Sequence, residues 1–312
     1  MRGADVILML EVADPWGEMN SVTDPFKEYR RLASDSVKTI TLSFSDVYLK
    51  SNYQDFQRFQ SINMPISGDV QASLPEFTEQ LRRAMDAPRK QALAARTPEL
   101  RAAWEEMRKR ARDAAAVGWD ASPVSTSRLA AEVWDVIKAE PWSLVVSDRI
   151  TWARRLWPTT EFHQMLGGSG GQGVGYSLPG AVGAALANRD KGLLSVTFQP
   201  DGDLLYAPGA LWTAAHHKIP LLFVMHNNRG YHQETMHLQR MASMHNRRMD
   251  QAWIGNALEN PTIDFAKMAQ SYGVWAEGPI SDPAALGPAL RRALAVVKSG
   301  LPALLDVVCQ AR

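Results

Sequence analysis

Helix-forming and strand-forming segments alternate with short connections from about residue 121 to the end of the chain. Amphipathic stretches such as 125–140 and 282–300 are followed by short apolar runs such as 143–148 and 302–309. A strand, a helix and a further strand in this order place the two strands parallel to each other. The pattern therefore predicts an α/β fold built on a doubly wound parallel sheet.

Two further parts precede this alternation. Residues 1–88 contain apolar, β-branched runs and one capped amphipathic stretch, which predict a partial second α/β domain. Residues 89–120 are rich in Ala, Arg and Glu, and the mixture of charge signs favours a solvated helical linker over a nucleic-acid-binding arm. We therefore expect three parts: 1–88, 89–120 and 121–312.

Charge and cysteine content exclude several classes of protein. The 34 Lys and Arg residues balance 33 Asp and Glu residues, so the net charge of +1 predicts neither a nucleic-acid nor a membrane partner. Cys309 is the only cysteine, which rules out an internal disulfide framework. The first apolar run is short, and no segment reaches the roughly 20 apolar residues of a membrane span. These features predict a cytoplasmic protein.

One predicted strand-helix-strand unit, residues 199–231, has polar side chains at both of its ends. Asp201-Gly202-Asp203 follows one strand, and Asn227-Asn228-Arg229-Gly230 follows the next. In a doubly wound sheet, ligands bind at the carboxyl ends of the strands. Magnesium takes oxygen ligands and uses only one or two protein side chains when phosphate completes its shell. Asp201, Asn228 and the Gly230 carbonyl are the candidate ligands.

A glycine-rich segment, residues 167–187, runs into a predicted helix. Glycine lets a ligand approach the backbone closely. The segment lacks the Gly-Lys-Ser/Thr of a phosphate-binding P-loop, and it does not open an N-terminal dinucleotide-binding unit. Taken alone, it is therefore compatible with a cofactor loop or with an ordinary strand-helix turn.

Taken together, these segments resemble the thiamine diphosphate enzymes of the acetolactate synthase, pyruvate decarboxylase and benzoylformate decarboxylase superfamily. That family has Gly-Asp-Gly followed at a set distance by Asn-Asn, and here Asn228 follows Asp201 by 27 positions. The stretch from Gly173 to Ala187 also resembles the family segment whose apolar side chain holds the cofactor bent, which corresponds to Val174. The resemblance covers the diphosphate-binding domain in 121–312 and the second half of the middle domain in 1–88.

The resemblance implies roles for individual residues. Magnesium would be held by Asp201, Asn228 and Gly230. The cofactor-binding set would be Gly173, Val174, Gly175, Gly202, Asp203, Leu204, Asn228, Gly230 and Tyr231. Glu234 and His232 are the catalytic candidates, since relatives of the pyruvate decarboxylase type carry a glutamate four residues after the glycine. The alternative for Glu234 is an exposed carboxylate in a first helical turn, stabilised by the helix dipole.

The sequence does not assign a function to three other histidines or to one segment. His216 and His217 are expected on a helix surface, and His226 close to the cofactor. Residues 236–255 lie where the family has a mobile segment, and a subunit-contact surface fits them equally well.

Two departures from the family pattern stand beside the motif. Pro200 replaces its first glycine, and Asp203 occupies the position where Ser or Ala often follows the second one. We expect Asp203 to be tolerated as the cap of a helix that begins near Leu204.

The family activates its cofactor with a glutamate on a pyrimidine-binding domain, for which we find no counterpart in these 312 residues. The resemblance therefore implies a second chain with that domain, in a heterotetramer of two copies of each. The expected function is nonoxidative C–C bond cleavage or formation next to a carbonyl, with a 2-oxoacid or acyl-CoA substrate. A thiamine diphosphate oxidoreductase subunit and a noncatalytic cofactor-binding fragment are the alternatives.

Overall fold

The computed structural model describes residues 1–312 except 2, 24–27, 45–57, 147–150, 168–172 and 312. The chain divides into two compact units, Met1–Leu100 and Arg101–Arg312. The three-part division at 88 and 120 stays a prediction.

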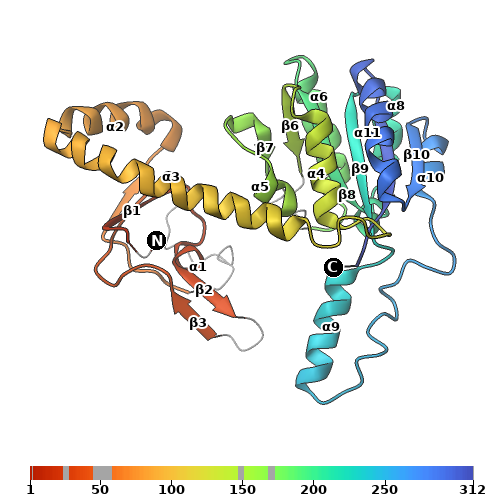
Figure 1. The fold of residues 1–312 in the computed structure, drawn as a ribbon, viewed down its shortest axis with the longest axis horizontal. Coiled ribbons are helices and arrows are strands. Elements are labelled where there is room, and N and C mark those ends of the chain that lie inside the picture. The colour runs from red at the N-terminus through yellow and green to blue at the C-terminus, as the bar shows by residue number, and fades with distance from the viewer. Residues whose placement is uncertain (2, 24–27, 45–57, 147–150, 168–172, 312) are drawn as a thin grey trace. The chain divides into compact units, whose positions relative to one another are not determined.

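The second unit is built on a six-stranded sheet in which every strand pair is parallel (Figure 1). The spatial order is β10-β11-β9-β8-β6-β7. The strands are β6 (Trp142–Val145), β7 (Met165–Leu166), β8 (Leu194–Pro200), β9 (Leu221–Asn227), β10 (Trp275–Ile280) and β11 (Ala303–Val308). Sequence analysis predicted all of them except the two-residue edge strand β7, which is too short to produce an apolar run.

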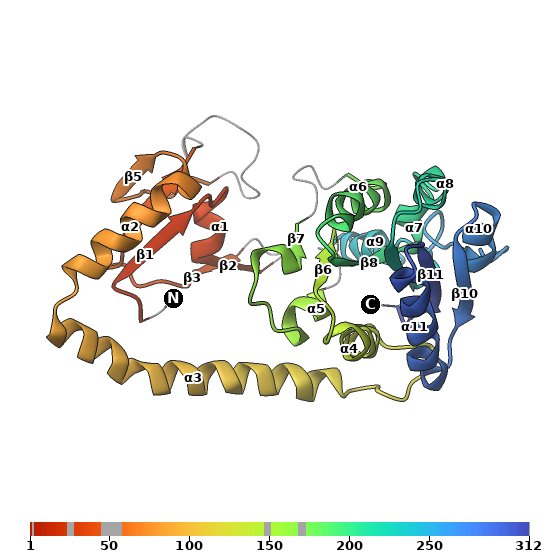
Figure 2. The same cartoon turned by 90° about the horizontal axis from the view of Figure 1, so that it is seen from above.

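Helices cover both faces of this sheet, as Figure 2 shows from above. One face packs against α4 (Thr126–Ile137), α5 (Thr151–Leu156) and α11 (Pro283–Lys298). The other packs against α6 (Ser177–Arg189), α8 (Gly209–His216) and α10 (Phe265–Ser271). Burial on both faces explains why the central strands read as continuous apolar runs, since all seven residues of β9 are buried. The predicted α/β class with a doubly wound parallel sheet is confirmed.

The direction in which the chain adds strands reverses next to β6. From β6 the chain steps outward to β7, and then returns to place β8 on the opposite side of β6, followed by β9. Ligands of open parallel sheets bind at the carboxyl ends of the strands near such a reversal. The carboxyl ends of β8 and β9 are therefore the first place to look for a site.

The first unit has a smaller, parallel sheet with the order β1-β4-β5. Its elements are β1 (Val6–Leu10), α1 (Pro15–Met19), the antiparallel pair β2 (Asn20–Thr23) and β3 (Glu28–Arg31), β4 (Lys38–Ser43), β5 (Met64–Ser67) and α2 (Val70–Ala84). Its described core is small and consists of Met9, Met19, Ala33, Val37 and Ile62. The unit is α/β, as predicted.

A long helix, α3 (Ala87–Ala115), runs through the segment that was predicted as a helical linker. Near its end, Arg108 donates hydrogen bonds to the carbonyl oxygens of Arg155 and Leu156 at 3.1 and 2.6 Å. These bonds satisfy carbonyls at the end of α5 that have no partner within that helix. Among the described helices, none combines the length and the apolar character needed to cross a membrane.

Candidate functional site

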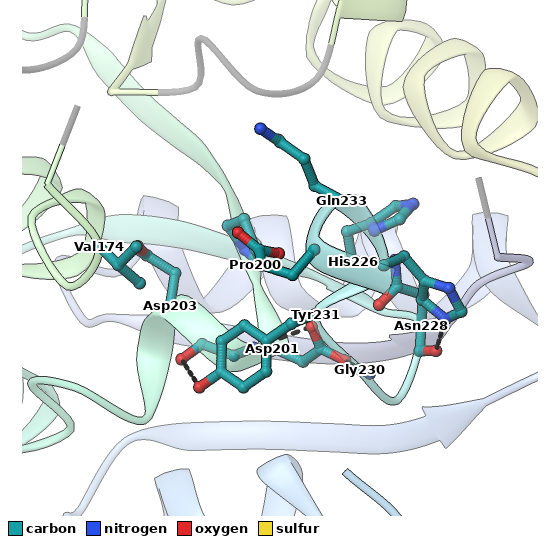
Figure 3. A pocket seen from close by; sticks show the side chains of 12 residues that line it. Val174, Pro200, Asp201, Asp203, His226, Asn228, Gly230, Tyr231 and Gln233 are labelled. Atoms are coloured by element: carbon teal, nitrogen blue, oxygen red, sulfur yellow. Dashed lines mark hydrogen bonds between the residues drawn. The ribbon is translucent and has the colours of Figure 1, made fainter. Parts of the chain in front are cut away.

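A pocket opens at the carboxyl ends of β8 and β9, on the short helix α7 (Asp201–Leu204) and the start of α9 (His232–Met244) (Figure 3). Its lining residues come from three segments that are far apart in the sequence: Val174, Pro200, Asp201, Gly202, Asp203, His226, Asn228, Gly230, Tyr231, His232, Gln233 and Glu234. The polar residues at both ends of the strand-helix-strand unit therefore meet in one place. The parallel neighbours β8 and β9 bring them together.

Asp201 is a buried carboxylate of this pocket, with 2% of its surface exposed. Its Oδ1 accepts a hydrogen bond from the Gly202 N–H at 2.8 Å, and its Oδ2 accepts one from the Gly230 N–H at 3.1 Å. Burial raises the pKa of Asp201 to about 6, although these N–H groups partly offset the shift. A cation in the pocket would favour the ionised carboxylate.

Gly202 must lack a side chain because the ring of Tyr231 lies directly against it. A Cβ at position 202 would stand 2.4 Å from Cε1 of Tyr231. The Tyr231 hydroxyl donates a hydrogen bond to the Gly202 carbonyl oxygen at 3.2 Å, and burial raises the pKa of this phenol to about 12. Tyr231 therefore keeps its proton and joins the turn after β8 to the turn after β9.

Asn228 carries the most informative atom of the pocket. Its Oδ1 is buried and has no hydrogen-bond partner among the described residues. Leaving a buried polar atom without a partner costs about 1–3 kcal/mol, so such atoms in native proteins require an explanation. A ligand that accepts electron density from Oδ1, such as a cation, would supply the missing interaction.

Gly230 completes the same side of the pocket. A Cβ at this position would meet the Asn256 carbonyl oxygen at 2.8 Å. Residues 256–258 return to lie beside this turn. The Tyr231 N–H donates to Asn256 O and the Leu258 N–H donates to Arg229 O, both at 2.8 Å. Residues 256–258 thus hold the turn from outside.

Asp203 does not cap the helix near Leu204, and this expectation was wrong. α7 already begins at Asp201, and the Asp203 carboxylate points to the glycine-rich segment. It accepts hydrogen bonds from the Gly175 N–H at 2.7 Å, from the Ser177 hydroxyl, and from Gln199 Nε2 at 3.2 Å. Asp203 therefore fixes the segment that carries Val174 at the rim of the pocket.

The glycine-rich segment is described only in part, since residues 168–172 lie outside the described residues. Val174 lines the pocket and is 43% exposed. Gly175 has a φ of 91°, and a Cβ there would meet Tyr206 Cβ at 2.6 Å, so this position requires glycine. Leu204 lies in the hydrophobic core. The cofactor roles of Gly173, Gly175 and Leu204 stay predictions.

The two histidines of the pocket are held in place by oxygen partners. The Nε2 atom of His226 lies 2.8 Å from the Thr126 hydroxyl at the start of α4, and Nε2 of His232 lies 2.9 Å from the Asn228 carbonyl oxygen. In contrast, His216 and His217 are exposed at the end of α8, as expected for a helix surface.

Glu234 lies in the first turn of α9 with an exposed side chain at the mouth of the pocket. This position fits both of its interpretations, a group that contacts substrate and a carboxylate stabilised by the helix dipole. α9 runs away from the carboxyl edge of the sheet (Figure 1). Several apolar side chains from this helix to Ile254 are exposed: Met236, Leu238, Met241, Met244, Met249, Trp253 and Ile254.

Sequence reasoning missed three residues that shape the site: Thr126, Ser177 and Gln199. Thr126 begins the first helix of the unit, and Ser177 begins the helix after the glycine-rich segment. The buried polar Gln199, next to the Pro200-Asp201-Gly202 motif, was the available signal. Its Nε2 donates to both Ser177 and Asp203.

The donor set suits a hard cation bound together with an anion. Within the described residues, no three His, Cys, Asp or Glu side chains gather into a metal-binding group. Asp203 is engaged by Gly175, Ser177 and Gln199, and Glu234 is exposed at the mouth, so Asp201, the Asn228 amide oxygen and backbone carbonyls are the donors left for a cation. This is the small protein share typical of magnesium on a phosphorylated ligand. The unpartnered Asn228 Oδ1, in the same pocket as the buried Asp201, fits such a group.

Comparison with protein families decides the class of the chain. Residues 148–307 match the family described as thiamine pyrophosphate enzyme, C-terminal TPP binding domain. The chain belongs to the thiamine pyrophosphate enzymes. Thiamine pyrophosphate is the thiamine diphosphate of the sequence analysis, so the predicted family is confirmed. The matched residues contain the whole pocket.

Curated relatives of this thiamine pyrophosphate enzyme match its second unit. IlvX of Mycobacterium tuberculosis, which carries the name of an acetolactate synthase large subunit, is 34% identical over 141 residues, covering 44% of this chain and 25% of IlvX. Benzoylformate decarboxylase of Pseudomonas aeruginosa is 31% identical over 146 residues, covering 44% of this chain and 23% of that enzyme.

Solved structures are similar over the entire chain. The thiamine diphosphate-dependent 4-hydroxybenzoylformate decarboxylase of Rhodococcus jostii superposes with a TM-score of 0.63 at 17% identity, covering 100% of this chain and 50% of that one. This likeness shows the fold of both units. The chain spans half of the solved structure and about a quarter of the curated relatives that it matches.

Proposed function

We propose that the chain is a subunit of a nonoxidative, magnesium-dependent thiamine diphosphate enzyme that cleaves or forms a C–C bond next to a carbonyl. The reaction types we infer are 2-oxoacid decarboxylation, acetolactate or acyloin synthesis, and cleavage of 2-hydroxyacyl-CoA. The names of two relatives support this range, since one is called an acetolactate synthase subunit and the other a decarboxylase.

The observation that carries the proposal is the buried Asn228 Oδ1, which lacks a described partner and lines the same pocket as the buried Asp201. In the proposed site, Asp201 and Asn228 bind magnesium with their side-chain oxygens and Gly230 binds it with its carbonyl. The backbone of Gly202, Asp203 and Leu204 would bind the diphosphate.

The organic part of the cofactor would lie against Val174, flanked by Gly173 and Gly175, and against Tyr231. When bound, thiamine diphosphate supplies a nucleophilic carbon and a ring that accepts electrons. Val174 restricts the shape that the cofactor adopts. Glu234, and His232 beside it, handle a proton at the substrate from the mouth of the pocket.

A second chain with a pyrimidine-binding domain completes the proposed enzyme, in a heterotetramer of two copies of each chain. Half of the solved structure that the chain matches has no counterpart in these residues, which supports a contribution from outside them. The substrate is proposed to be a 2-oxoacid or an acyl-CoA, and the location to be the cytoplasm.

The test combines identification of partners with an assay. We would purify the chain under gentle conditions, identify co-purifying polypeptides by mass spectrometry, and assay 2-oxoacids and 2-hydroxyacyl-CoA thioesters with thiamine diphosphate and magnesium. We expect turnover only when the second chain is present. Turnover by a monodisperse preparation of this chain alone would contradict the need for a second chain. Absence of thiamine diphosphate binding would contradict the proposed function.

A further inference from the structure

The β9 turn, residues 227–231, presents Asn228 and Gly230 to the pocket, yet part of what holds this turn lies outside the site. Asp306 stands in β11, beside β9, and none of its surface is exposed. Its Oδ1 accepts a hydrogen bond from Asn227 Nδ2 at 2.9 Å. We propose that Asp306 is a positioning residue, which through Asn227 fixes the β9 turn so that the Asn228 side chain is directed into the pocket. The inference rests on the proposed cofactor site.

Asn227 is the link in this arrangement because both polar atoms of its side chain are engaged. Besides the bond from Nδ2 to Asp306, its Oδ1 accepts from the Arg229 N–H at 3.3 Å, and its carbonyl oxygen accepts from the Cys309 N–H at 2.8 Å. The side chain of Asn227 is thereby committed to the interior. Of the two adjacent asparagines, only Asn228 has an oxygen left for a ligand.

The turn needs external support because its conformation is unfavourable on its own. Arg229 has a φ of 59°, a region that costs a residue with a side chain roughly 1 kcal/mol or more. The hydrogen bond that the Arg229 N–H donates to Asn227 Oδ1 stabilises this conformation. The next N–H, that of Gly230, then donates to Asp201 Oδ2. A displaced Asn227 would therefore move the magnesium side of the pocket.

The buried carboxylate is costly for the fold, which argues that it is kept for a purpose. Burial raises the pKa of Asp306, although the bonds from Asn227 and from the Phe265 N–H, at 3.2 Å, lower it. The bond to Phe265 holds the start of α10 and is structural. The bond to Asn227 serves the turn.

An exchange of the two side chains separates these roles. Asp306→Asn leaves one acceptor oxygen in place of two. Either the Asn227 side-chain amide or the Phe265 N–H therefore loses its acceptor. Asn227→Asp places two carboxylates against each other. In the double variant Asp306→Asn/Asn227→Asp, all three hydrogen bonds can form again: the new carboxylate accepts from the new amide and from Arg229, and the new amide oxygen accepts from Phe265.

Two readouts follow each variant of the full chain: hydrogen exchange of the peptide containing Arg229 and Gly230 without cofactor, and magnesium-dependent affinity for thiamine diphosphate by calorimetry. Each single change should raise the exchange rate and the Kd by about tenfold, the effect of one lost hydrogen bond to a charged group. The double variant should return both to within about threefold of wild type.

Asp264→Asn is the matched control, because the Asp264 side chain caps α10 at the Lys267 N–H without touching the turn. It should leave both the melting temperature and exchange at the turn close to wild type, because Asn caps a helix about as well as Asp does. Wild-type exchange in both single variants, or a folded double variant that behaves like the singles, would overturn the proposal. The exchange measurement needs no cofactor, so it decides the role of Asp306 even if wild type fails to bind thiamine diphosphate and the proposed function falls.

Discussion

The two turns that form the pocket are stabilised in different ways. In the β8 turn, residues 200–203, the charged group Asp201 is held by N–H groups of its own turn and of the neighbouring one. The β9 turn is held from the other side, by Asp306 of β11 and by residues 256–258. One turn therefore contributes a charge, and the other contributes a neutral oxygen in a fixed position.

Because of this difference, changes in the β8 turn should affect cofactor binding directly, whereas changes around the β9 turn should act through geometry. Replacing the carboxylate of the β8 turn removes the charge that a cation needs. Changes around the β9 turn leave the charge in place and alter where the oxygen of Asn228 lies. The predictions below test this contrast, beginning with the largest expected effect.

Removing the charge should have the strongest consequence. Asp201→Ala eliminates the anionic ligand of the proposed magnesium site, and we expect the magnesium-dependent affinity for thiamine diphosphate to fall by at least about 100-fold. Calorimetry in the presence of magnesium measures the change. Asp190→Ala, at an exposed carboxylate, is the control and should bind as wild type does. Unchanged affinity in Asp201→Ala would refute the assignment.

Glu234 should affect the reaction and leave cofactor binding intact. If this carboxylate handles a proton at the substrate, Glu234→Gln should lower kcat by about 100-fold, with cofactor affinity near the wild-type value. The assay is steady-state turnover of the complete enzyme. Glu140→Gln, at a carboxylate that pairs with Lys298 and does not line the pocket, controls for the loss of a negative charge elsewhere in the unit. Wild-type turnover in Glu234→Gln would mean that Glu234 has no role in the reaction and only interacts with the dipole of α9.

Asp203 should act through the segment that carries Val174. Asp203→Asn cannot accept hydrogen bonds from Gly175, Ser177 and Gln199 together, so we expect that segment to loosen and cofactor affinity to fall by about tenfold. The change should also speed hydrogen exchange at Gly175. Ser177→Ala removes only one of the three donors and should have a smaller effect. Equal affinity in Asp203→Asn and wild type would show that Asp203 does not position Val174.

The smallest effect concerns stability and pH in the metal-free chain. Because burial raises the Asp201 pKa from 3.8 to about 6, the folded state binds the proton more tightly than the unfolded state does. The free energy of unfolding contributed by Asp201 is therefore greatest at low pH and is lost as the pH rises through about 6, by at most about 3 kcal/mol.

Denaturant unfolding at about pH 5 and about pH 7.5 measures this contribution in wild type and in Asp201→Asn. The difference between the two proteins should shrink toward the lower pH. Saturating magnesium and thiamine diphosphate should reverse the trend in wild type, since the ligands bind the ionised carboxylate. If the free energy of unfolding depended on pH identically in both proteins, the raised pKa would not belong to Asp201.

The parts of the site that could be predicted are those encoded locally. Apolar runs identified β8 and β9, and the polar residues directly after them identified Asp201 and Asn228, because consecutive parallel strands end at the same edge. Glu234 came from the resemblance to relatives with a glutamate four residues after the glycine, and its role stays a prediction. All of these inferences depend on residues close together in the chain.

The support behind the site could not be predicted for a physical reason. Asp306 acts on Asn227 only because β11 lies next to β9, and strand order is set by the packing of all the helices. Asp203 turned out to accept from Gly175 and Ser177, although its sequence position equally suited a helix cap. A single sequence shows which residues are polar, but not which of several partners they will meet.

The central claim is that Asp201, Asn228 and Gly230 hold magnesium, which in turn holds the diphosphate. The most direct measurement is calorimetric titration of the wild-type chain with thiamine diphosphate, with magnesium and then with excess chelator. We expect binding to weaken by at least about 100-fold when magnesium is removed, and to weaken to the same extent with thiamine in place of thiamine diphosphate. Equal affinity with and without magnesium would contradict it.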